Sequence, residues 1–222
     1  MKKVTVIGAG TMGNGIAHVF AQTGFPVNLV DVSEKSLEKG MATLSKNLDR
    51  MLAKETISES DKTETLQRIA TFTSLGEGVQ DTDLEVEAAT ENLPVKLNIF
   101  GELDTLCPPH TILATNTSSI SITQIAAVTQ RPEQVIGMHF MNPVPIMKLV
   151  EIIRGYSTSD KVTETIMELS RQLGKTPTEV NDYPGFVATR ILMPMINEAI
   201  ANPRSALRGI QKPKVRTMSL IG

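Results

Sequence analysis

Two side chains with acid–base chemistry lie in apolar segments in the second half of the chain. His139 follows Met138 near the end of one apolar run, and Glu151 lies between Val150 and Ile152 in the next. A carboxylate within an apolar strand is costly unless it is paired, so we expect it to bind His139. Such a pair fixes the tautomer of the imidazole and leaves its other nitrogen free to accept a hydroxyl proton. The alternative is an ordinary core histidine.

A glycine-rich turn near the N-terminus has the spacing of a dinucleotide-binding turn. It reads Gly8-Ala9-Gly10-Thr11-Met12-Gly13, after a β-branched segment and before a helical pattern. The first glycine permits a tight turn, the second lets the backbone approach a pyrophosphate, and the third lets the helix pack closely on the strand. The N–H groups of the first helical turn then face the phosphates. Because such turns are common, the context must support the interpretation.

Asp31 supplies that context, because it ends the apolar segment that completes a strand–helix–strand unit. A carboxylate at this place accepts hydrogen bonds from the adenosine ribose and repels the additional phosphate of NADP, so the expected cofactor is NAD. Lys35 nearby leaves some tolerance of NADP. The alternative role for Asp31 is a helix cap, although Ser33 is better placed for that. A histidine base beside NAD implies oxidation of an alcohol to a ketone.

A polar segment, Asn116-Thr117-Ser118-Ser119, follows the apolar residues 112–115. Open α/β sheets bind ligands at the carboxyl ends of their strands, so these hydroxyl and N–H groups are expected where a substrate meets the nicotinamide. A plain helix cap explains the same residues equally well.

Composition excludes several classes of protein. The chain has 222 residues, 41% hydrophobic and 21% charged, with a net charge of −2, which is typical of a globular protein and gives no reason to expect nucleic-acid binding. The apolar run after Met1 is interrupted by glycines, so we expect no membrane segment and a cytoplasmic protein. The single cysteine, Cys107, precedes two prolines and is expected to be structural.

Strand and helix patterns alternate along most of the chain. The expected strands are residues 4–7, 27–31, 69–73, 84–88, 112–115, 135–140, 149–153 and 176–180. The expected helices are two polar helices between Lys35 and Arg68, which form an insertion, and residues 94–106, 121–128 and 160–173. This alternation predicts a doubly wound, mostly parallel, Rossmann-type α/β sheet.

The C-terminal part departs from this pattern. We expect one nucleotide-binding domain over residues 1–183 and the first helix of an all-α domain over residues 184–200, kinked at Pro194. Its apolar face, from Phe186 onward, needs a partner to cover it. Residues 201–222 hold five basic residues and no acidic ones, and we expect this tail to be poorly ordered.

At this point the chain resembles the 3-hydroxyacyl-CoA dehydrogenases, and most nearly the bacterial 3-hydroxybutyryl-CoA dehydrogenases, over residues 1–200. The resemblance rests on the glycine turn, on residues 114–119, on His139-Phe140-Met141-Asn142-Pro143-Val144-Pro145 and on Asp182-Tyr183-Pro184-Gly185-Phe186. It implies NAD-dependent oxidation of (3S)-3-hydroxyacyl-CoA to 3-oxoacyl-CoA, and the reverse. Short acyl chains, as in 3-hydroxybutyryl-CoA and acetoacetyl-CoA, are expected.

The resemblance also implies roles for single residues. His139 would be the general base, Glu151 its orienting partner, and Ser118 a hydrogen-bond donor to the substrate oxygen. The residues expected near the cofactor are, besides the glycine turn and Asp31, Glu91, Lys96, Asn116, Ser118 and Asn142. The residues expected to meet CoA are Arg50, Lys54 and Ser118. A solvated helix face is the alternative for Arg50 and Lys54.

Two departures from the family pattern bear on activity. Thr189 stands where the family has an asparagine that helps to bind the substrate carbonyl. The family's C-terminal helical domain, which makes its homodimers, is not recognisable after residue 200, so the dimerising part is expected to be mostly absent and the family-like part truncated. A dinucleotide-binding module with little catalysis is therefore the rival hypothesis. A dehydrogenase of non-CoA hydroxy acids is disfavoured, because those enzymes generally use a lysine base.

Overall fold

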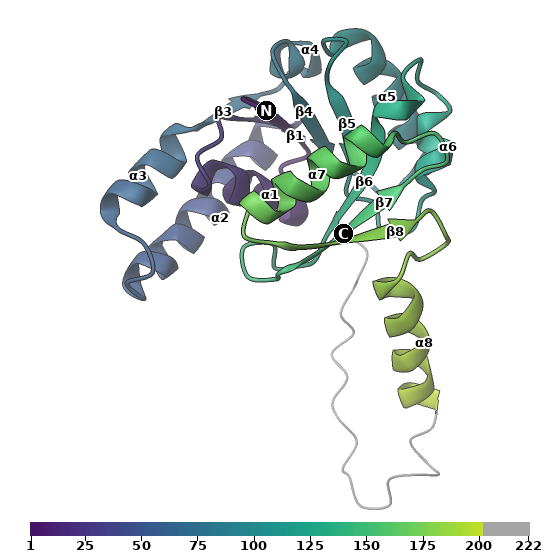
Figure 1. Cartoon of the computed structure of the whole chain (residues 1–222). Helices are drawn as coiled ribbons and strands as arrows, with labels where there is room; N and C mark the ends of the chain where they lie inside the picture. Colours follow the sequence, from purple (N-terminus) through teal and green to yellow (C-terminus); the bar gives the residue numbers. More distant parts are fainter. Residues whose placement is uncertain (202–222) are drawn as a thin grey trace, which may run out of the picture.

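The computed structural model describes residues 1–201 and is built on one eight-stranded sheet (Figure 1). The strand order is β3-β2-β1-β4-β5-β6-β7-β8, and every neighbouring pair is parallel except β6 and β7. The first six strands have the order of a Rossmann fold, with its crevice where the order reverses, between β1 and β4. The strands are β1 (Val4–Ile7), β2 (Val27–Val30), β3 (Ile69–Phe72), β4 (Leu84–Glu87), β5 (Ile112–Thr115), β6 (Val135–Phe140), β7 (Leu149–Arg154) and β8 (Thr176–Asn181).

Helices connect these strands and cover both faces of the sheet. They are α1 (Thr11–Gln22), α2 (Glu34–Ala53), α3 (Glu59–Gln67), α4 (Leu75–Val79), α5 (Leu93–Leu106), α6 (Ile122–Ala126), α7 (Asp160–Gln172) and α8 (Ala188–Ala201), with a 3₁₀ turn at Pro132–Gln134. The predicted doubly wound, mostly parallel fold is confirmed. The sequence analysis missed α4, a short helix with two glycines and therefore little helical propensity.

The core forms two apolar layers, one on each side of the sheet. On one side α1, α2 and α7 pack their apolar residues on the strands, among them Ile16, Leu37 and Ile166. On the other side α4, α5 and α6 do the same, with Phe100 and Ile125 fully buried. The inner strands are therefore buried on both faces, whereas the edge strands β3 and β8 are mostly exposed or half-buried.

The insertion between β2 and β3 is the predicted pair of helices, α2 and α3. Ser33 caps α2 by accepting a hydrogen bond from the Ser36 N–H, and Ser58 with Asp61 forms a capping box on α3. This charged insertion lies only partly outside the core. Leu37, Leu44 and Leu48 of α2 are buried, and α2 packs against α1.

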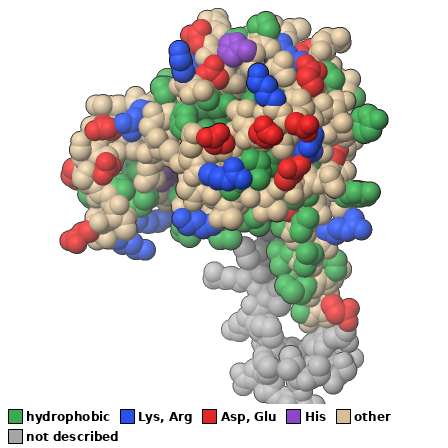
Figure 2. Space-filling view, in the orientation of Figure 1, with side chains coloured by type: hydrophobic (Ala, Val, Ile, Leu, Met, Phe, Trp, Pro, Cys, Tyr) green, Lys and Arg blue, Asp and Glu red, His purple; other side chains and the backbone are tan. Residues whose placement is uncertain are grey.

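The start of α8 differs from the prediction. Gly185 and Phe186 both have a positive φ, 75° and 48°, so the helix begins at Ala188 and not at residue 184. Phe186 is buried in the core of the sheet and does not belong to the apolar face of the helix. That face, which includes Ile191 and Met195, is exposed, and α8 extends away from the sheet (Figures 1 and 2).

No helix within residues 1–201 is long and apolar enough to cross a membrane. The prediction for the basic tail falls on residues that lie almost wholly outside the described part of the chain.

Candidate active site

The glycine turn between β1 and α1 is shaped for a close approach of a ligand to the backbone. Gly8 has a φ of 96°, and a Cβ at Gly13 would lie 1.7 Å from the carbonyl oxygen of Gly8. A side chain is therefore excluded at both positions. A Cβ at Gly10 would meet no heavy atom within 4 Å, so the space in front of this residue is open. Gly8 and Gly13 are thus required by the turn and by the packing of α1, and Gly10 leaves room for the ligand approach that the spacing predicts.

The N-terminus of α1 is free to bind an anion. Gly10 is its N-cap residue and provides no side-chain cap, and the first turn contains Thr11, Met12 and Gly13. The N–H groups of a first helical turn have no partner within the helix, and they favour a phosphate electrostatically. The open space at Gly10 and these N–H groups together fit the pyrophosphate of a dinucleotide.

Asp31, which follows β2, forms a hydrogen bond with the glycine turn. Its Oδ2 accepts a hydrogen bond from the Ala9 N–H at 2.8 Å, and its Oδ1 accepts one from the Ser33 N–H at 3.0 Å. The contact with Ala9 was not foreseen, and it positions the carboxylate beside the phosphate cradle. A carboxylate has about four acceptor positions, so Asp31 can also accept hydrogen bonds from ribose hydroxyls.

His139 and Glu151 form the predicted pair. They lie directly opposite each other on the antiparallel strands β6 and β7, and His139 Nδ1 lies 2.8 Å from Glu151 Oε2. Both side chains are buried, His139 with 6% and Glu151 with 1% of its surface exposed. Within residues 1–201 the Nε2 atom of His139 makes no hydrogen bond, and it is not one of the fully buried unpaired atoms. It is therefore accessible to a small ligand.

The other oxygen of Glu151 binds the start of α8. Its Oε1 accepts hydrogen bonds from the Val187 N–H at 3.0 Å and from the Ala188 N–H at 2.8 Å. Burial alone would raise the pKa of Glu151, but the hydrogen bonds from His139, Ala188 and Val187 outweigh it and lower the pKa below its usual value. The carboxylate is therefore ionised at neutral pH, so Nδ1 of His139 is the protonated nitrogen of the neutral ring.

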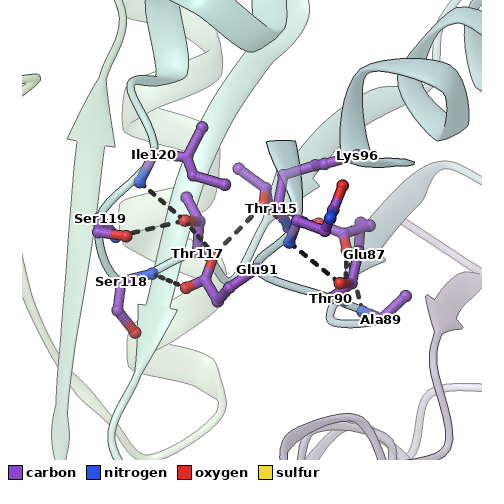
Figure 3. A network of polar contacts seen from close by, with 11 residues as sticks. Glu87, Ala89, Thr90, Glu91, Lys96, Thr115, Thr117, Ser118, Ser119 and Ile120 are labelled. Carbon is purple, nitrogen blue, oxygen red and sulfur yellow. Dashed lines mark hydrogen bonds and ion pairs between the residues drawn. The ribbon is translucent and has the colours of Figure 1, made fainter. Parts of the chain in front are cut away.

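The loop after β5 carries Ser118 and is held by Glu91 (Figure 3). Thr117 Oγ1 donates a hydrogen bond to Glu91 Oε2 at 2.7 Å, and the Ser118 N–H donates one to Oε1 at 2.6 Å. The Ser118 hydroxyl points away from Glu91 and makes no hydrogen bond in the described chain. The helix-cap interpretation of this segment is wrong, because α6 begins later, with Ser121 as its N-cap.

Asn116 joins this loop to the histidine strand. Its Oδ1 accepts a hydrogen bond from the Phe140 N–H at 2.9 Å, one residue after His139. The loop after β6 packs against α1, because a Cβ at Gly15 of this helix would lie 3.0 Å from the Val144 side chain. Ser118, His139 and the glycine turn therefore all lie at the carboxyl-end edge of the sheet, at the ends of β5, β6 and β1.

Lys96 lies deeper than the resemblance suggests. Its side chain is 1% exposed, and its Nζ contacts Glu87 Oε2 and, at 3.3 Å, Thr115 Oγ1. Thr115 Oγ1 also donates a hydrogen bond to Glu87 at 2.9 Å (Figure 3). The ammonium is thus directed into the protein beneath the loop that carries Glu91. The sequence analysis did not single out Glu87, because a glutamate at the end of an apolar strand gives no local sign of its distant partners.

The remaining predicted residues lie at the edges of the site. Asn142 is exposed in the loop after β6, and Thr189 is in the first turn of α8, next to the Ala188 N–H that binds Glu151. Arg50 and Lys54 are exposed in the last turn of α2 and at its C-cap. Since α2 starts beside Asp31, a rise of about 1.5 Å per residue places Arg50 about 25 Å along the helix axis. Arg50 Nη1 donates to Asn47 at 3.2 Å.

Two other groups clarify the site. Cys107 ends α5 in the core, where burial raises its pKa to about 12, so it stays a neutral thiol.

Asp182 was not identified as functional by the sequence analysis. Its carboxylate accepts hydrogen bonds from the Ser121 hydroxyl at 2.7 Å and from the Ile122 and Thr123 N–H groups at 3.0 and 2.8 Å. These partners are about sixty positions away, which local sequence patterns do not reveal.

Comparisons with known proteins agree with this geometry. A family model described as "3-hydroxyacyl-CoA dehydrogenase, NAD binding domain" matches residues 3–183. A 3-hydroxybutyryl-CoA dehydrogenase of Bradyrhizobium diazoefficiens is 52% identical over 90% of this chain and 68% of its own length. One of Clostridioides difficile is 48% identical over 89% of this chain and 70% of its own. The crystal structure of (S)-3-hydroxybutyryl-CoA dehydrogenase from Ralstonia eutropha is similar with a TM-score of 0.87 and 50% identity, over 90% of this chain and 70% of that one.

Proposed function

The chain belongs to the 3-hydroxyacyl-CoA dehydrogenase family, and on that premise we propose that it oxidises (3S)-3-hydroxyacyl-CoA to 3-oxoacyl-CoA with NAD, and catalyses the reverse reaction. The observation that carries this proposal is the His139 and Glu151 pair. One imidazole nitrogen is held by an ionised carboxylate, while the other makes no hydrogen bond in the described chain and lies at the same edge of the sheet as the glycine turn. The domain proposed for the cofactor is residues 1–183.

The residues divide the chemistry among them. The bound NAD supplies the hydride acceptor. His139 Nε2 takes the proton of the substrate hydroxyl, and Glu151 stabilises the imidazolium that forms. Ser118, whose hydroxyl has no partner in the described chain, donates a hydrogen bond to the same substrate oxygen. In the reverse direction His139 returns the proton to the ketone oxygen.

The glycine turn and Asp31 hold the pyrophosphate and the adenosine ribose. Asn142 and the loop that carries Glu91 border the nicotinamide end. The choice of NAD over NADP follows from Asp31, which would repel a ribose phosphate. Its carboxylate is fixed by Ala9 and Ser33, so it cannot easily turn away from such a phosphate.

An acyl-CoA is the proposed substrate because α2 offers cations far from the reacting centre. Arg50 and Lys54 are exposed and lie near the end of α2 remote from Asp31. A thioester with a long phosphate-bearing arm can reach both regions, whereas a free hydroxy acid cannot. A short acyl chain is proposed because the relatives described above are named for 3-hydroxybutyryl-CoA.

One observation favours a second candidate, an NAD-binding protein with little turnover. Thr189 stands where the family has asparagine, at the start of α8 and beside the catalytic pair. A threonine hydroxyl is shorter than an asparagine amide, so the substrate carbonyl would lose a donor. Loss of one such donor costs about 10²–10³ in kcat in other enzymes.

The loss of NADH absorbance with acetoacetyl-CoA separates the two candidates. We expect steady turnover with acetoacetyl-CoA and NADH, much less with NADPH, and none with free acetoacetate as the matched control. NADH binding without turnover would support the second candidate. Equal turnover of the free acid would contradict the proposed role of CoA and of Arg50 and Lys54.

A further inference from the structure

The start of α8 contacts the catalytic pair through its backbone. Val187 is the residue before the helix and Ala188 is its first residue, and both N–H groups donate to Glu151 Oε1. The N–H groups at a helix N-terminus have no partner inside the helix and carry a partial positive charge. An ionised, buried carboxylate is the partner that such groups favour most.

This arrangement fixes which oxygen of Glu151 faces the histidine. Oε1 is taken by two donors from α8, so Oε2 is the oxygen that remains for His139 Nδ1 at 2.8 Å. Without the two N–H groups the carboxylate would be buried with only one partner. It could then rotate about its terminal bond, and the imidazole would lose its fixed orientation.

The segment that delivers these N–H groups is held on both sides. Asp182, at its start, accepts three hydrogen bonds from the residues that begin α6. Phe186 is buried, and its ring lies 5.8 Å from the His139 ring, measured between centroids. The positive φ angles at Gly185 and Phe186 turn the chain sharply between these anchors, which brings the helix N-terminus to Glu151.

The rest of α8 makes little contact with the body of the protein. The helix extends away from the sheet, and its apolar residues Ile191, Met195 and Ile200 are exposed (Figures 1 and 2). No helix or strand of the described chain packs extensively on it. The described link between α8 and the active site is therefore its first turn, which contacts Glu151.

We propose that the backbone N–H groups of Val187 and Ala188 are positioning groups for the general base, so that the seating of α8 determines whether His139 is oriented for proton transfer. This inference rests on the proposed dehydrogenase function. The two N–H groups act through Glu151 and do not touch the substrate. A movement of α8 that separates them from Oε1 would lower kcat without changing the glycine turn.

A proline at position 188 tests the proposal, because proline lacks the N–H and suits the first position of a helix. Ala188→Pro is expected to lower kcat for acetoacetyl-CoA reduction about tenfold or more, as expected for a lost hydrogen bond to a charged group. NADH affinity should not change. Ala188→Ser, which keeps the N–H, is the matched control, and its kcat should fall far less than that of Ala188→Pro.

A double-mutant cycle shows whether the effect passes through Glu151. In the Glu151→Gln background, Ala188→Pro should cost less than about twofold, because the ionised acceptor is already gone. An equal loss in both backgrounds would overturn the proposal and leave the proposed function intact. A backbone ester at position 188, which removes the N–H and adds no ring, is the second variant, and it must give the same pattern.

The tautomer of His139 provides a readout that needs no turnover. In ¹⁵N spectra of the imidazole, the wild-type protein should show mainly the Nδ1–H form, and Ala188→Pro a mixture with the Nε2–H form. An unchanged tautomer in both the proline and the ester variants would overturn the proposal. Absence of turnover in the wild-type protein would instead contradict the proposed function, and the tautomer measurement would still decide the positioning role.

Discussion

Two buried acid–base pairs lie at the carboxyl ends of the strands, and their surroundings differ. The Lys96 and Glu87 pair is closed, because the ammonium contacts Glu87 and Thr115 and the carboxylate is also bound by backbone N–H groups. The His139 and Glu151 pair is open on one side. Its carboxylate is fully occupied, but His139 Nε2 has no partner in the described chain and keeps access to solvent.

The difference shows that burial of a charged pair does not by itself mark an active site. A closed pair can only support the structure around it, here the turn that carries Glu91. An open pair has one unsatisfied atom that a ligand can use. The two pairs also form in different ways. His139 and Glu151 meet because β6 and β7 are antiparallel and place the two residues directly opposite each other.

Removing the open nitrogen should have the largest effect. His139→Gln is expected to lower kcat for acetoacetyl-CoA reduction about 10²–10⁴-fold, the usual contribution of a general base, while NADH affinity stays the same. Stopped-flow turnover and NADH fluorescence titration measure the two quantities. An equal loss of NADH affinity would mean that His139, like Lys96, supports the structure.

Breaking the closed pair should act on stability. Glu87→Gln leaves the Lys96 ammonium buried without its counter-ion, which typically costs about 3–5 kcal/mol of unfolding free energy. Urea denaturation measures it. Replacing both residues, with Glu87→Leu and Lys96→Met together, should recover most of this loss.

If Glu87→Gln keeps wild-type stability but loses NADH binding, the Lys96 and Glu87 pair is not a purely structural pair. Lys96 would then have turned to the cofactor, as the family resemblance suggests, and the pair would not be closed in the working enzyme. Thr115→Val is a milder control, because it removes one neutral hydrogen-bond partner of Glu87 and leaves the ion pair intact.

The sequence predicted most of the fold because its signals are local. The glycine spacing, the β-branched strands and the caps at Ser33 and Ser58 each lie within a few residues of the element that they determine. Even the His139 and Glu151 pair could be predicted, because a carboxylate in an apolar strand requires a partner and a short loop returns the chain. The bounds of most strands differ from the predicted ones by no more than one residue.

The rest of the site depends on contacts between distant segments. Glu91 holds Ser118 across twenty-seven positions, and Val187 meets Glu151 across thirty-six. The local sequence does not indicate such a contact, because a glutamate in a loop is usually an ordinary solvated side chain. The start of α8 was misplaced for a related reason. The apolar spacing that includes Phe186 fits a helix, but the left-handed backbone at Gly185 and Phe186 buries that ring in the sheet.

A second histidine extends the comparison to pH. His18 of α1 is fully buried, and within residues 1–201 neither ring nitrogen lies within hydrogen-bonding geometry of a partner. Burial lowers the pKa of His18 to about 4, a weaker interaction with Gln22 opposes this shift, and the charge of Lys175 adds to it. The unfolded chain then binds a proton below about pH 6.5 that the folded chain does not, so His18 destabilises the fold as the pH falls.

Between pH 7 and pH 5 this effect amounts to about 2 kcal/mol. Burial also raises the pKa of Glu85, which acts in the opposite direction because the folded chain then binds the extra proton. We therefore compare wild type with His18→Leu by urea denaturation at both values of pH. Wild type should lose about 2 kcal/mol relative to the variant. If the difference in stability between wild type and His18→Leu does not change with pH, His18 takes up its proton in the folded protein as readily as in the unfolded chain.

The smallest expected effect concerns the open pair alone. Thr189→Asn restores the residue that the family has at this position, next to the Ala188 N–H that binds Glu151. The amide adds a donor for the substrate carbonyl, so kcat/KM for acetoacetyl-CoA should rise about tenfold, part of the usual contribution of such a donor. NADH affinity and the urea midpoint should not move, since the closed pair is untouched. Thr189→Val is the control, and it should lower kcat/KM only if the threonine hydroxyl already contacts the substrate. If Thr189→Asn leaves kcat/KM unchanged while His139→Gln abolishes turnover, the first turn of α8 acts through its backbone and not through this side chain.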